Sequence, residues 1–239
     1  MLVTSLLAFR ETPDEVYAQA VKTATNRMLA DIEREVAYTS SLIGRRELDP
    51  RVMAAMGKVP REDFVPADLQ YLAYDNGPLP IGHGQTISQP YIVALMTDLL
   101  QPEAEHIVLE VGTGSGYQAA VLSLLVKKIF TMERVAALGE ASAARLQSLG
   151  YSNIEYCTGN GYEGWPAHAP YDGIIVTAAA SHIPPALVDQ LKAGGRLVIP
   201  VGLPYMPQEL LLVEKDEAGE MHTRDILGVA FVPLKDGAS

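Results

Sequence analysis

The sequence is poor in the residues that build disulfides and metal centres. Cys157 is the only cysteine, and a single thiol forms neither an internal disulfide nor a cysteine-rich metal site. The five histidines show no metal-ligand spacing. We therefore predict that the protein binds no metal.

Basic residues are scarce as well. Lysine and arginine number 18 against 29 aspartates and glutamates, which gives a net charge of −11. An acidic chain is repelled by a phosphate backbone and by an anionic membrane surface. We therefore expect neither nucleic acid nor membrane as a partner.

Long apolar runs are absent too, since none approaches the ~20 residues that span a membrane. The chain opens with MLVTSLLAFRETPDE, in which no basic region precedes the short apolar patch. We interpret this start as neither a signal nor a transit peptide, and expect a cytoplasmic protein.

What is present is enough apolar sequence, 48% of 239 residues, for one hydrophobic core. We expect a single domain over 1–239. Residues 1–75 form a helical addition, with a helix predicted over 13–46, and residues 76–90 form a loop rich in glycine and proline.

From residue 106 the pattern alternates between short apolar strands and helices. Such alternation is typical of a parallel sheet covered on both faces, here over 106–202. Two further strand-like runs within 207–234, at 209–216 and 226–234, predict an antiparallel end of the sheet. The fold class is therefore α/β, a doubly wound, mostly parallel Rossmann-like sheet. The predicted strands of the parallel part cover 106–111, 128–133, 153–159, 171–179 and 196–202.

The turn after the first of these strands is rich in glycine. It reads Gly112, Thr113, Gly114, Ser115, Gly116. Glycines there allow a sharp turn and close approach of a ligand to the backbone. The dinucleotide pattern G-x-G-x-x-G requires glycine where this chain has Tyr117, so a plain tight turn is the alternative.

An acidic residue, Glu133, ends the second strand, 21 positions after Gly112. A carboxylate there can accept the hydroxyls of a ribose. The alternative is a solvated glutamate at a helix start. Together, the strand, glycine turn, helix, strand and acid favour a nucleoside ligand.

The identity of the nucleoside depends on charge. No Walker lysine is present, which disfavours ATP, and Glu110 beside the turn would oppose a pyrophosphate but suit a cation. After the third strand, Asn160 and Gly161 could meet an adenine edge. S-adenosylmethionine, a nucleoside with a sulfonium and an ammonium group, fits these residues better than NAD.

At these residues the chain resembles an S-adenosylmethionine-dependent methyltransferase, and other segments narrow the resemblance. VPREDFVP at 59–66 and PLPIGHGQTISQP at 78–90 are similar to the protein-L-isoaspartate O-methyltransferase family. So are VLEVGTGSGY at 108–117, IIVTAA at 174–179 and FVPL at 231–234. The match runs in order from about residue 32 to 235.

The resemblance implies methyl transfer from S-adenosylmethionine to the carboxylate of L-isoaspartyl residues in damaged proteins. The ester then closes to a succinimide, whose hydrolysis returns some normal aspartyl linkage. The family's active-site serine corresponds to Ser88, with Thr86 as its neighbour on the substrate. Ile87, His83 and the backbone of Val232 are expected near the substrate, although an exposed loop imidazole is as good an interpretation of His83.

One position departs from the family pattern. The family has Gly-Asp-Gly after the third strand, with the aspartate on the adenine amino group, whereas this chain has Asn160 between Gly159 and Gly161. Asparagine keeps a carbonyl acceptor without the charge. Residues 1 to about 30 precede the usual start and receive no role.

The chemistry agrees with the absence of a Ser-His-Asp or Cys-His constellation. A carboxylate is already ionised at pH 7 and needs no general base. Two hydroxyls two residues apart on an extended segment share one face, so Thr86 and Ser88 can orient it. Ser88 could alternatively cap the following helix, because Gln89-Pro90 comes next.

Other functions remain as alternatives. A related carboxyl methyltransferase acting on a dedicated peptide would use the same nucleoside site. A non-catalytic binding protein is the alternative that Asn160 supports. A dehydrogenase is disfavoured by the misplaced third glycine. We expect a monomer.

Overall fold

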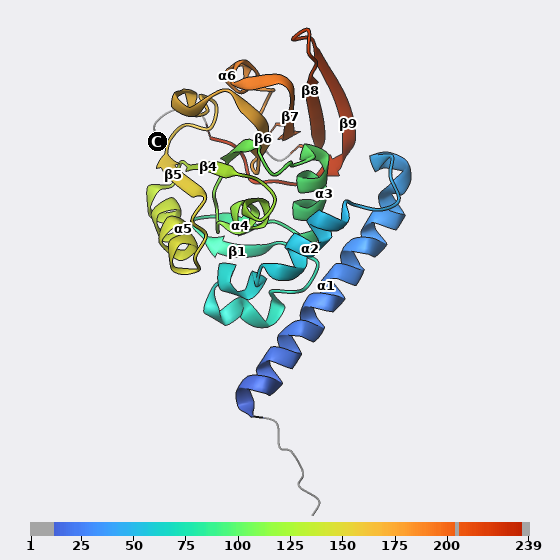
Figure 1. Cartoon of the computed structure of the whole chain (residues 1–239), viewed down its shortest axis with the longest axis vertical. Coiled ribbons are helices and arrows are strands. Elements are labelled where there is room, and N and C mark those ends of the chain that lie inside the picture. The colour runs from blue at the N-terminus through green and yellow to red at the C-terminus, as the bar shows by residue number, and fades with distance from the viewer. Residues whose placement is uncertain (1–11, 204–205, 236–239) are drawn as a thin grey trace, which may run out of the picture.

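The computed structural model describes residues 12–203 and 206–235. Seven strands form one sheet in the order β5-β4-β3-β6-β7-β8-β9 (Figure 1). β3 to β7 pair in parallel, and β8 and β9 close the sheet with antiparallel pairing. This is the predicted mostly parallel Rossmann-like sheet. The strands are β3 (Ile107–Val111), β4 (Lys128–Glu133), β5 (Ile154–Thr158), β6 (Tyr171–Val176), β7 (Leu191–Val201), β8 (Gln208–Lys215) and β9 (Met221–Val229).

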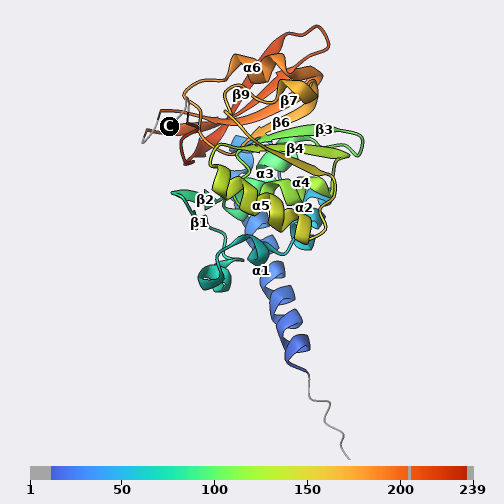
Figure 2. The ribbon, with the colours of Figure 1, turned by 90° about the vertical axis from the view of Figure 1, so that its left-hand side faces the viewer.

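Helices cover the two faces of the sheet unequally. Figure 2 shows α3, α4 and α5 below the strands and α6 above them. The larger core joins α1 to α5 to one sheet face, and the smaller core places Leu187 and Leu191 against Leu109 and Ile174 on the other. The helices are α1 (Pro13–Ile43), α2 (Pro50–Lys58), α3 (Pro90–Leu100), α4 (Tyr117–Ser123), α5 (Ala136–Ser148) and α6 (Pro185–Asp189), with short 3-10 turns at Arg61–Phe64, Ala67–Leu72 and Pro166–His168.

The N-terminal addition is dominated by α1, which begins at a capping box. Thr12 Oγ1 accepts a hydrogen bond from the Glu15 amide, and the Glu15 carboxylate accepts one from the Thr12 amide. Gly44, with φ of 72°, ends the helix three residues before the predicted position. The first turns extend beyond the body of the protein (Figure 1), while Ile32 and Val36 are buried against it.

The glycine- and proline-rich segment contains a small hairpin that the sequence pattern did not reveal. β1 (Leu79–Gly82) pairs with β2 (Gln85–Ile87) antiparallel, with Pro80 opposite Thr86. The turn holds His83 and Gly84, both at positive φ. The short strands show no hydrophobic alternation because proline and glycine occupy half of β1.

The end of the chain differs from the predicted strand over 226–234. β9 ends at Val229. Beyond it, the Gln208 side chain accepts a hydrogen bond from the Phe231 amide at 2.6 Å and donates one to the Phe231 carbonyl at 3.0 Å. The following residues pair instead with Ala179, whose amide donates to the Val232 carbonyl at 2.8 Å. This change of partner carries Val232 toward the carboxyl ends of the parallel strands.

Two other boundaries moved. β7 begins at Leu191 rather than at the predicted residue 196, because Gly194 and Gly195 lie in an irregularity of the β6–β7 pairing. α6 spans only Pro185–Asp189, whereas the sequence pattern predicts a helix over 183–191. The apolar start of the chain lies in residues 1–11, outside the described residues. Among the residues that are described, no helix is both long and apolar enough to span a bilayer.

Candidate active site

The glycine-rich turn after β3 lies where the strand order reverses, the usual ligand site of such sheets. The amides of Gly112 and Thr113 both donate to the Met132 carbonyl of β4, at 2.8 and 3.1 Å. Gly112 has φ of 99° and Gly116 of 88°, conformations that favour glycine. A Cβ on Gly112 would also overlap the Thr177 hydroxyl. The turn therefore requires glycine at both positions.

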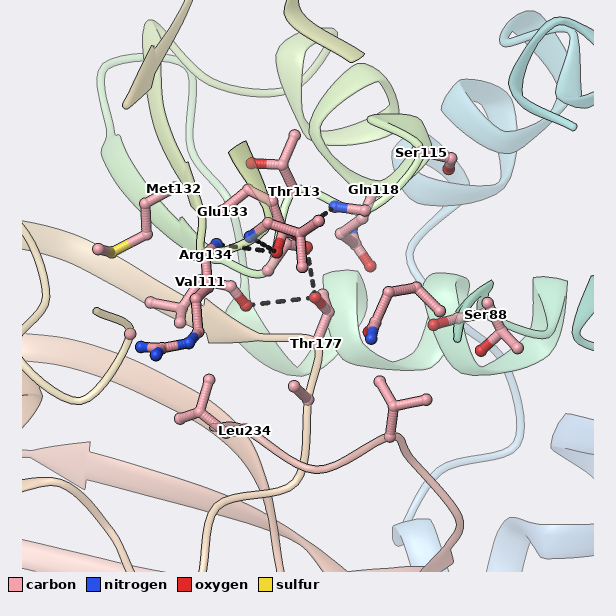
Figure 3. A pocket seen from close by; sticks show the side chains of 18 of the residues that line it. Ser88, Val111, Thr113, Ser115, Gln118, Met132, Glu133, Arg134, Thr177 and Leu234 are labelled. Carbon is pink, nitrogen blue, oxygen red and sulfur yellow. Dashed lines mark hydrogen bonds between the residues drawn. The ribbon is translucent and has the colours of Figure 1, made fainter. Parts of the chain in front are cut away.

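Glu133, at the end of β4, lines the pocket directly beside this turn (Figure 3). Its Oε2 accepts from the Gly114 amide at 3.0 Å, and its Oε1 from the Arg134 and Val135 amides at 2.8 and 3.0 Å. A carboxylate has about four acceptor positions, so it retains capacity for a ligand hydroxyl. Glu133 is 9% exposed, which rules out the solvated alternative.

Helix α5 holds the turn from behind. Ser142 Oγ donates to the Gly114 carbonyl at 2.5 Å, and Arg145 Nη1 donates to the Ser115 carbonyl at 2.9 Å. Both carbonyls are thereby satisfied inside the protein, so the turn keeps one shape. Sequence reasoning missed Ser142 and Arg145 because nothing in the spacing relates α5 to the turn.

Glu110 does not reach the pocket. The residue is fully buried, and its Oε2 accepts a hydrogen bond from Thr131 Oγ1 at 2.5 Å. Burial raises the pKa of Glu110 to about 8, so the carboxyl is mostly neutral at pH 7. The expectation of an ionised carboxylate beside a cationic ligand therefore does not match this geometry. Thr131 connects Glu110 to the pocket, because the Thr131 hydroxyl also forms a 2.7 Å hydrogen bond with the hydroxyl of Thr113, which lines the pocket.

Asn160 is also set back from the pocket wall. Its Oδ1 accepts from the Tyr162 amide and its Nδ2 donates to Glu163 Oε1, both at 3.1 Å. Its neighbours Gly159 and Gly161 line the pocket instead. A Cβ on Gly161 would come within 2.8 Å of Leu234, so this wall is close-packed. The side chain orders the turn after β5 in the described structure.

The opposite side of the pocket is formed by the end of the hairpin, where Thr86, Ile87 and Ser88 line it. Ile87 is buried, Thr86 is exposed and Ser88 is partly exposed. The capping interpretation of Ser88 is wrong. Gln89 occupies the cap position without a side-chain bond, and the Asn76 side chain instead accepts from the Tyr91 amide at 3.1 Å.

A second cavity, a groove of about 470 Å³, adjoins the pocket. Four residues line both: Thr86, Ser88, Thr177 and Val232. Ser88 and Thr177, two of these four residues, are labelled in Figure 3. His83 lines neither cavity and is exposed at the hairpin turn.

Thr177 was missed as a site residue although it lies in the IIVTAA segment. It follows β6, and its hydroxyl donates to the Gly112 carbonyl at 2.5 Å. The signal available was its place after a parallel strand, since the carboxyl ends of such strands meet at one edge. The same edge supplies Met132 and Arg134 to the pocket.

A buried arginine holds the segment that precedes the hairpin. Arg61, in the VPREDFVP segment, donates from Nε to the Ala73 carbonyl at 2.7 Å and from Nη2 to the Gly77 carbonyl at 3.1 Å. Its guanidinium lies 5.0 Å from the centre of the Tyr117 ring, which lines the pocket. Arg61 therefore braces both the turn that carries Asn76 and the helix that follows the glycine turn.

The arrangement fits a nucleoside ligand. The turn offers close approach at Gly112 and Gly114, and Glu133 offers a carboxylate acceptor beside it. Within the described ranges, no three His, Cys, Asp or Glu side chains gather as metal ligands would. The hydroxyls of Thr86 and Ser88 meet this pocket from the groove side.

Comparison with known proteins gives a consistent result. Residues 34–239 match the family model described as protein-L-isoaspartate(D-aspartate) O-methyltransferase. The protein-L-isoaspartate O-methyltransferase 2 of Syntrophobacter fumaroxidans is 59% identical over 214 residues, 90% of this chain and 87% of the relative. The protein of that name from Polaromonas sp. is 61% identical over 207 residues, 87% of this chain and 98% of the relative.

Solved structures agree. A putative protein-L-isoaspartate O-methyltransferase from Plasmodium falciparum, in complex with S-adenosyl-L-homocysteine, superposes with a TM-score of 0.70 at 26% identity. The match covers 87% of this chain and 97% of that one. A second structure, titled protein-L-isoaspartate O-methyltransferase, gives a TM-score of 0.76 at 26% identity over 89% of this chain and 66% of that one.

Proposed function

The chain belongs to the protein-L-isoaspartate(D-aspartate) O-methyltransferase family, and from this premise we propose how its residues perform the reaction. It is a repair enzyme that moves a methyl group from S-adenosylmethionine to the carboxylate of L-isoaspartyl residues in proteins. The roles of individual side chains are the proposal, and they rest on the geometry of the pocket and groove.

S-adenosylmethionine supplies an electrophilic methyl group on its sulfonium. We assign its binding to the turn from Gly112 to Gly116, to Glu133 and to the wall at Gly161. Glu133 is held by three amides, so it accepts a ribose hydroxyl without reorganising. Glu110 acts from behind the turn, through Thr131 and Thr113, and Asn160 acts by shaping the turn after β5.

The proposal for the substrate rests on one observation, the set of residues shared by the two cavities. An isoaspartyl carboxylate lying at this junction would have its peptide in the groove and face the cofactor pocket. Thr86 and Ser88 there donate hydrogen bonds that orient it. The isoaspartyl carboxylate is already ionised, so the site has only to align it with the methyl group, and these hydrogen bonds do so. Ser88 is therefore assigned to orientation, not to covalent catalysis.

The Val232 backbone and Ile87 complete the proposed peptide contact. Val232 lines both cavities, and its carbonyl is held by the Ala179 amide, so its position is set by the core. His83 is exposed at the hairpin turn, and we assign it a contact with a part of the bound protein that lies farther from the isoaspartyl group. The single domain proposed for 1–239 thereby contributes its loop, its core and its C-terminal strands to one site.

We propose that proteins and peptides with isoaspartyl residues are the only macromolecular partners, and that the enzyme works as a monomer in the cytoplasm. The net charge of −11 opposes association with nucleic acid and with anionic lipid.

The test is transfer of labelled methyl from S-adenosylmethionine to a short peptide containing L-isoaspartate. The same peptide with normal L-aspartate is the control. Methylation of the isoaspartyl peptide alone is expected. Transfer to neither peptide, with cofactor binding shown by calorimetry, would point to a dedicated peptide substrate or to a binding protein. A panel of unrelated isoaspartyl sequences separates broad repair from a dedicated substrate.

A further inference from the structure

The groove beside the methyl-transfer pocket carries one unpaired charge. Among the described residues that line it, Glu209 is the only ionisable one; the others are neutral, such as Pro78, Gln89 and Ile92. The Glu209 side chain makes no hydrogen bond or ion pair with any residue that the structure describes, and it is exposed.

The sheet register explains why this carboxylate stays in the groove. Glu209 is the second residue of β8, between the inward-facing Gln208 and Leu210. Its partner across the β8–β9 pair is Gly228, which has no side chain to cover it. A Cβ built on Gly228 would lie 4.0 Å from Glu209 Oε1, so the carboxylate stands over bare backbone.

We infer that Glu209 selects isoaspartyl substrates by the charge of the residues next to the isoaspartate, favouring lysine or arginine and disfavouring acidic residues. The inference rests on the proposed function, because it takes the groove as the peptide site. The isoaspartyl group lies at the end shared with the pocket, at Ser88 and Thr177, whereas Glu209 and Gly228 line the groove alone. The charge therefore faces a flanking residue of the substrate.

The expected size of the effect follows from the exposure of the Glu209 side chain to solvent. An ion pair in contact with solvent changes binding only a few-fold, and a repulsion of the same strength acts in the opposite direction. We expect kcat/KM to fall roughly threefold to tenfold from a lysine-flanked to a glutamate-flanked peptide. We expect the change to appear in KM and not in kcat, because Glu209 does not line the cofactor pocket.

The test uses three peptides that differ only in one residue beside the isoaspartate: lysine, glutamine or glutamate. The varied residue is moved from two positions before the isoaspartate to three after it, which locates the position that meets Glu209. Each enzyme is scored by its ratio of kcat/KM on the lysine and glutamate peptides, so loss of folded enzyme cancels. Glu209→Gln should bring the ratio close to one, and Glu209→Lys should invert it.

Glu217→Gln is the matched control, because it removes the same charge from the exposed tip of the β8–β9 hairpin, outside the groove. It should keep the wild-type ratio. Raising ionic strength from 0.1 to 1 M shortens the screening length from about 10 to about 3 Å and should also lower the wild-type ratio.

The outcomes separate this inference from the function it rests on. Wild-type enzyme that methylates no isoaspartyl peptide would overturn the proposed function. Wild-type enzyme that methylates all three peptides equally at every position would leave the function intact and overturn the inference. A lysine preference that Glu209→Gln does not change would also overturn it, since the selecting charge would then lie elsewhere.

Discussion

Two glutamates of this protein, Glu110 and Glu133, differ in their chemistry because they differ in their surroundings. Glu110 and Glu133 both stand near the ends of neighbouring parallel strands. Glu133 lines the pocket and is bound by amides, whereas Glu110 is enclosed and its pKa is raised by desolvation. In the proposed mechanism Glu133 accepts a hydrogen bond from the ligand, whereas Glu110 provides a mostly neutral hydrogen-bonding group beneath the turn.

Ser88→Ala tests the proposed orienting hydroxyl. Loss of one hydrogen bond to a charged carboxylate costs about 1.5–3 kcal/mol, so kcat/KM for isoaspartyl peptide should fall roughly 10- to 100-fold. Affinity for S-adenosylmethionine, measured by calorimetry, should change little. Ser88→Thr, which keeps a hydroxyl, is the control. Unchanged turnover in Ser88→Ala would remove Ser88 from the mechanism.

Glu110 predicts a pH dependence of stability. Its pKa of about 8 in the folded chain exceeds the ordinary value of 4.5, so between these pH values the folded state holds a proton that the unfolded state has released. This contribution to stability is full below pH 4.5, falls as pH rises and is lost above about pH 8. Glu110→Gln cannot ionise and retains an acceptor for Thr131.

The free energy of unfolding, measured in urea from pH 5 to 9, checks this prediction. The value for Glu110→Gln minus that for the wild type should rise with pH and level off above about pH 8. Parallel curves for the two proteins would show that the Glu110 carboxyl ionises normally in the folded state.

At the scale of elements, helix α1 is divided between two environments. Its first turns, including Tyr17, are exposed, whereas Ile32 and Val36 are packed into the larger core. The family match begins at residue 34, so Ile32 lies in the part of α1 that precedes it. The helical addition is therefore a structural part of the core from its middle onward.

Paired substitutions in α1 check this division. Ile32→Ala removes a fully buried side chain and should lower the free energy of unfolding by about 2–5 kcal/mol. Tyr17→Ala, on the exposed portion, should change it by less than about 0.5 kcal/mol. Denaturant unfolding measures both. Equal losses would mean that the first turns of α1 are covered in solution.

The elements around the site were predictable to different degrees. The parallel strands carry continuous apolar runs, so β4 begins and ends where the sequence pattern placed it, at Lys128 and Glu133. The β1–β2 hairpin was missed because proline and glycine occupy half of β1, so its short strands show no hydrophobic alternation. The shift of β9 follows from the Gln208 contact with Phe231, which no local pattern encodes.

At the scale of the whole molecule, we predict a monomer that unfolds as one domain. The net charge of −11 opposes self-association, and the two cores share one sheet. Light scattering should give a mass near 25.8 kDa, and thermal unfolding should show a single transition. A mass of twice that value, or two separated transitions, would contradict the prediction.

The amino-acid sequence by itself determined the chemistry of this protein. Apolar runs specify the parallel strands, and glycines specify the turn. Spacing places the Glu133 carboxylate beside that turn, and the 78–90 segment indicates the family. These features depend on residue type and on spacing along the chain, which the sequence states directly.

Only the tertiary structure decided which of these side chains share a site. It enclosed Glu110, set back Asn160, exposed His83, and brought Thr177 and Val232 to Ser88. The physical reason is that burial, ionisation and contact depend on neighbours from distant segments. Those neighbours are set by strand order and register, which arise only when the whole sheet is assembled.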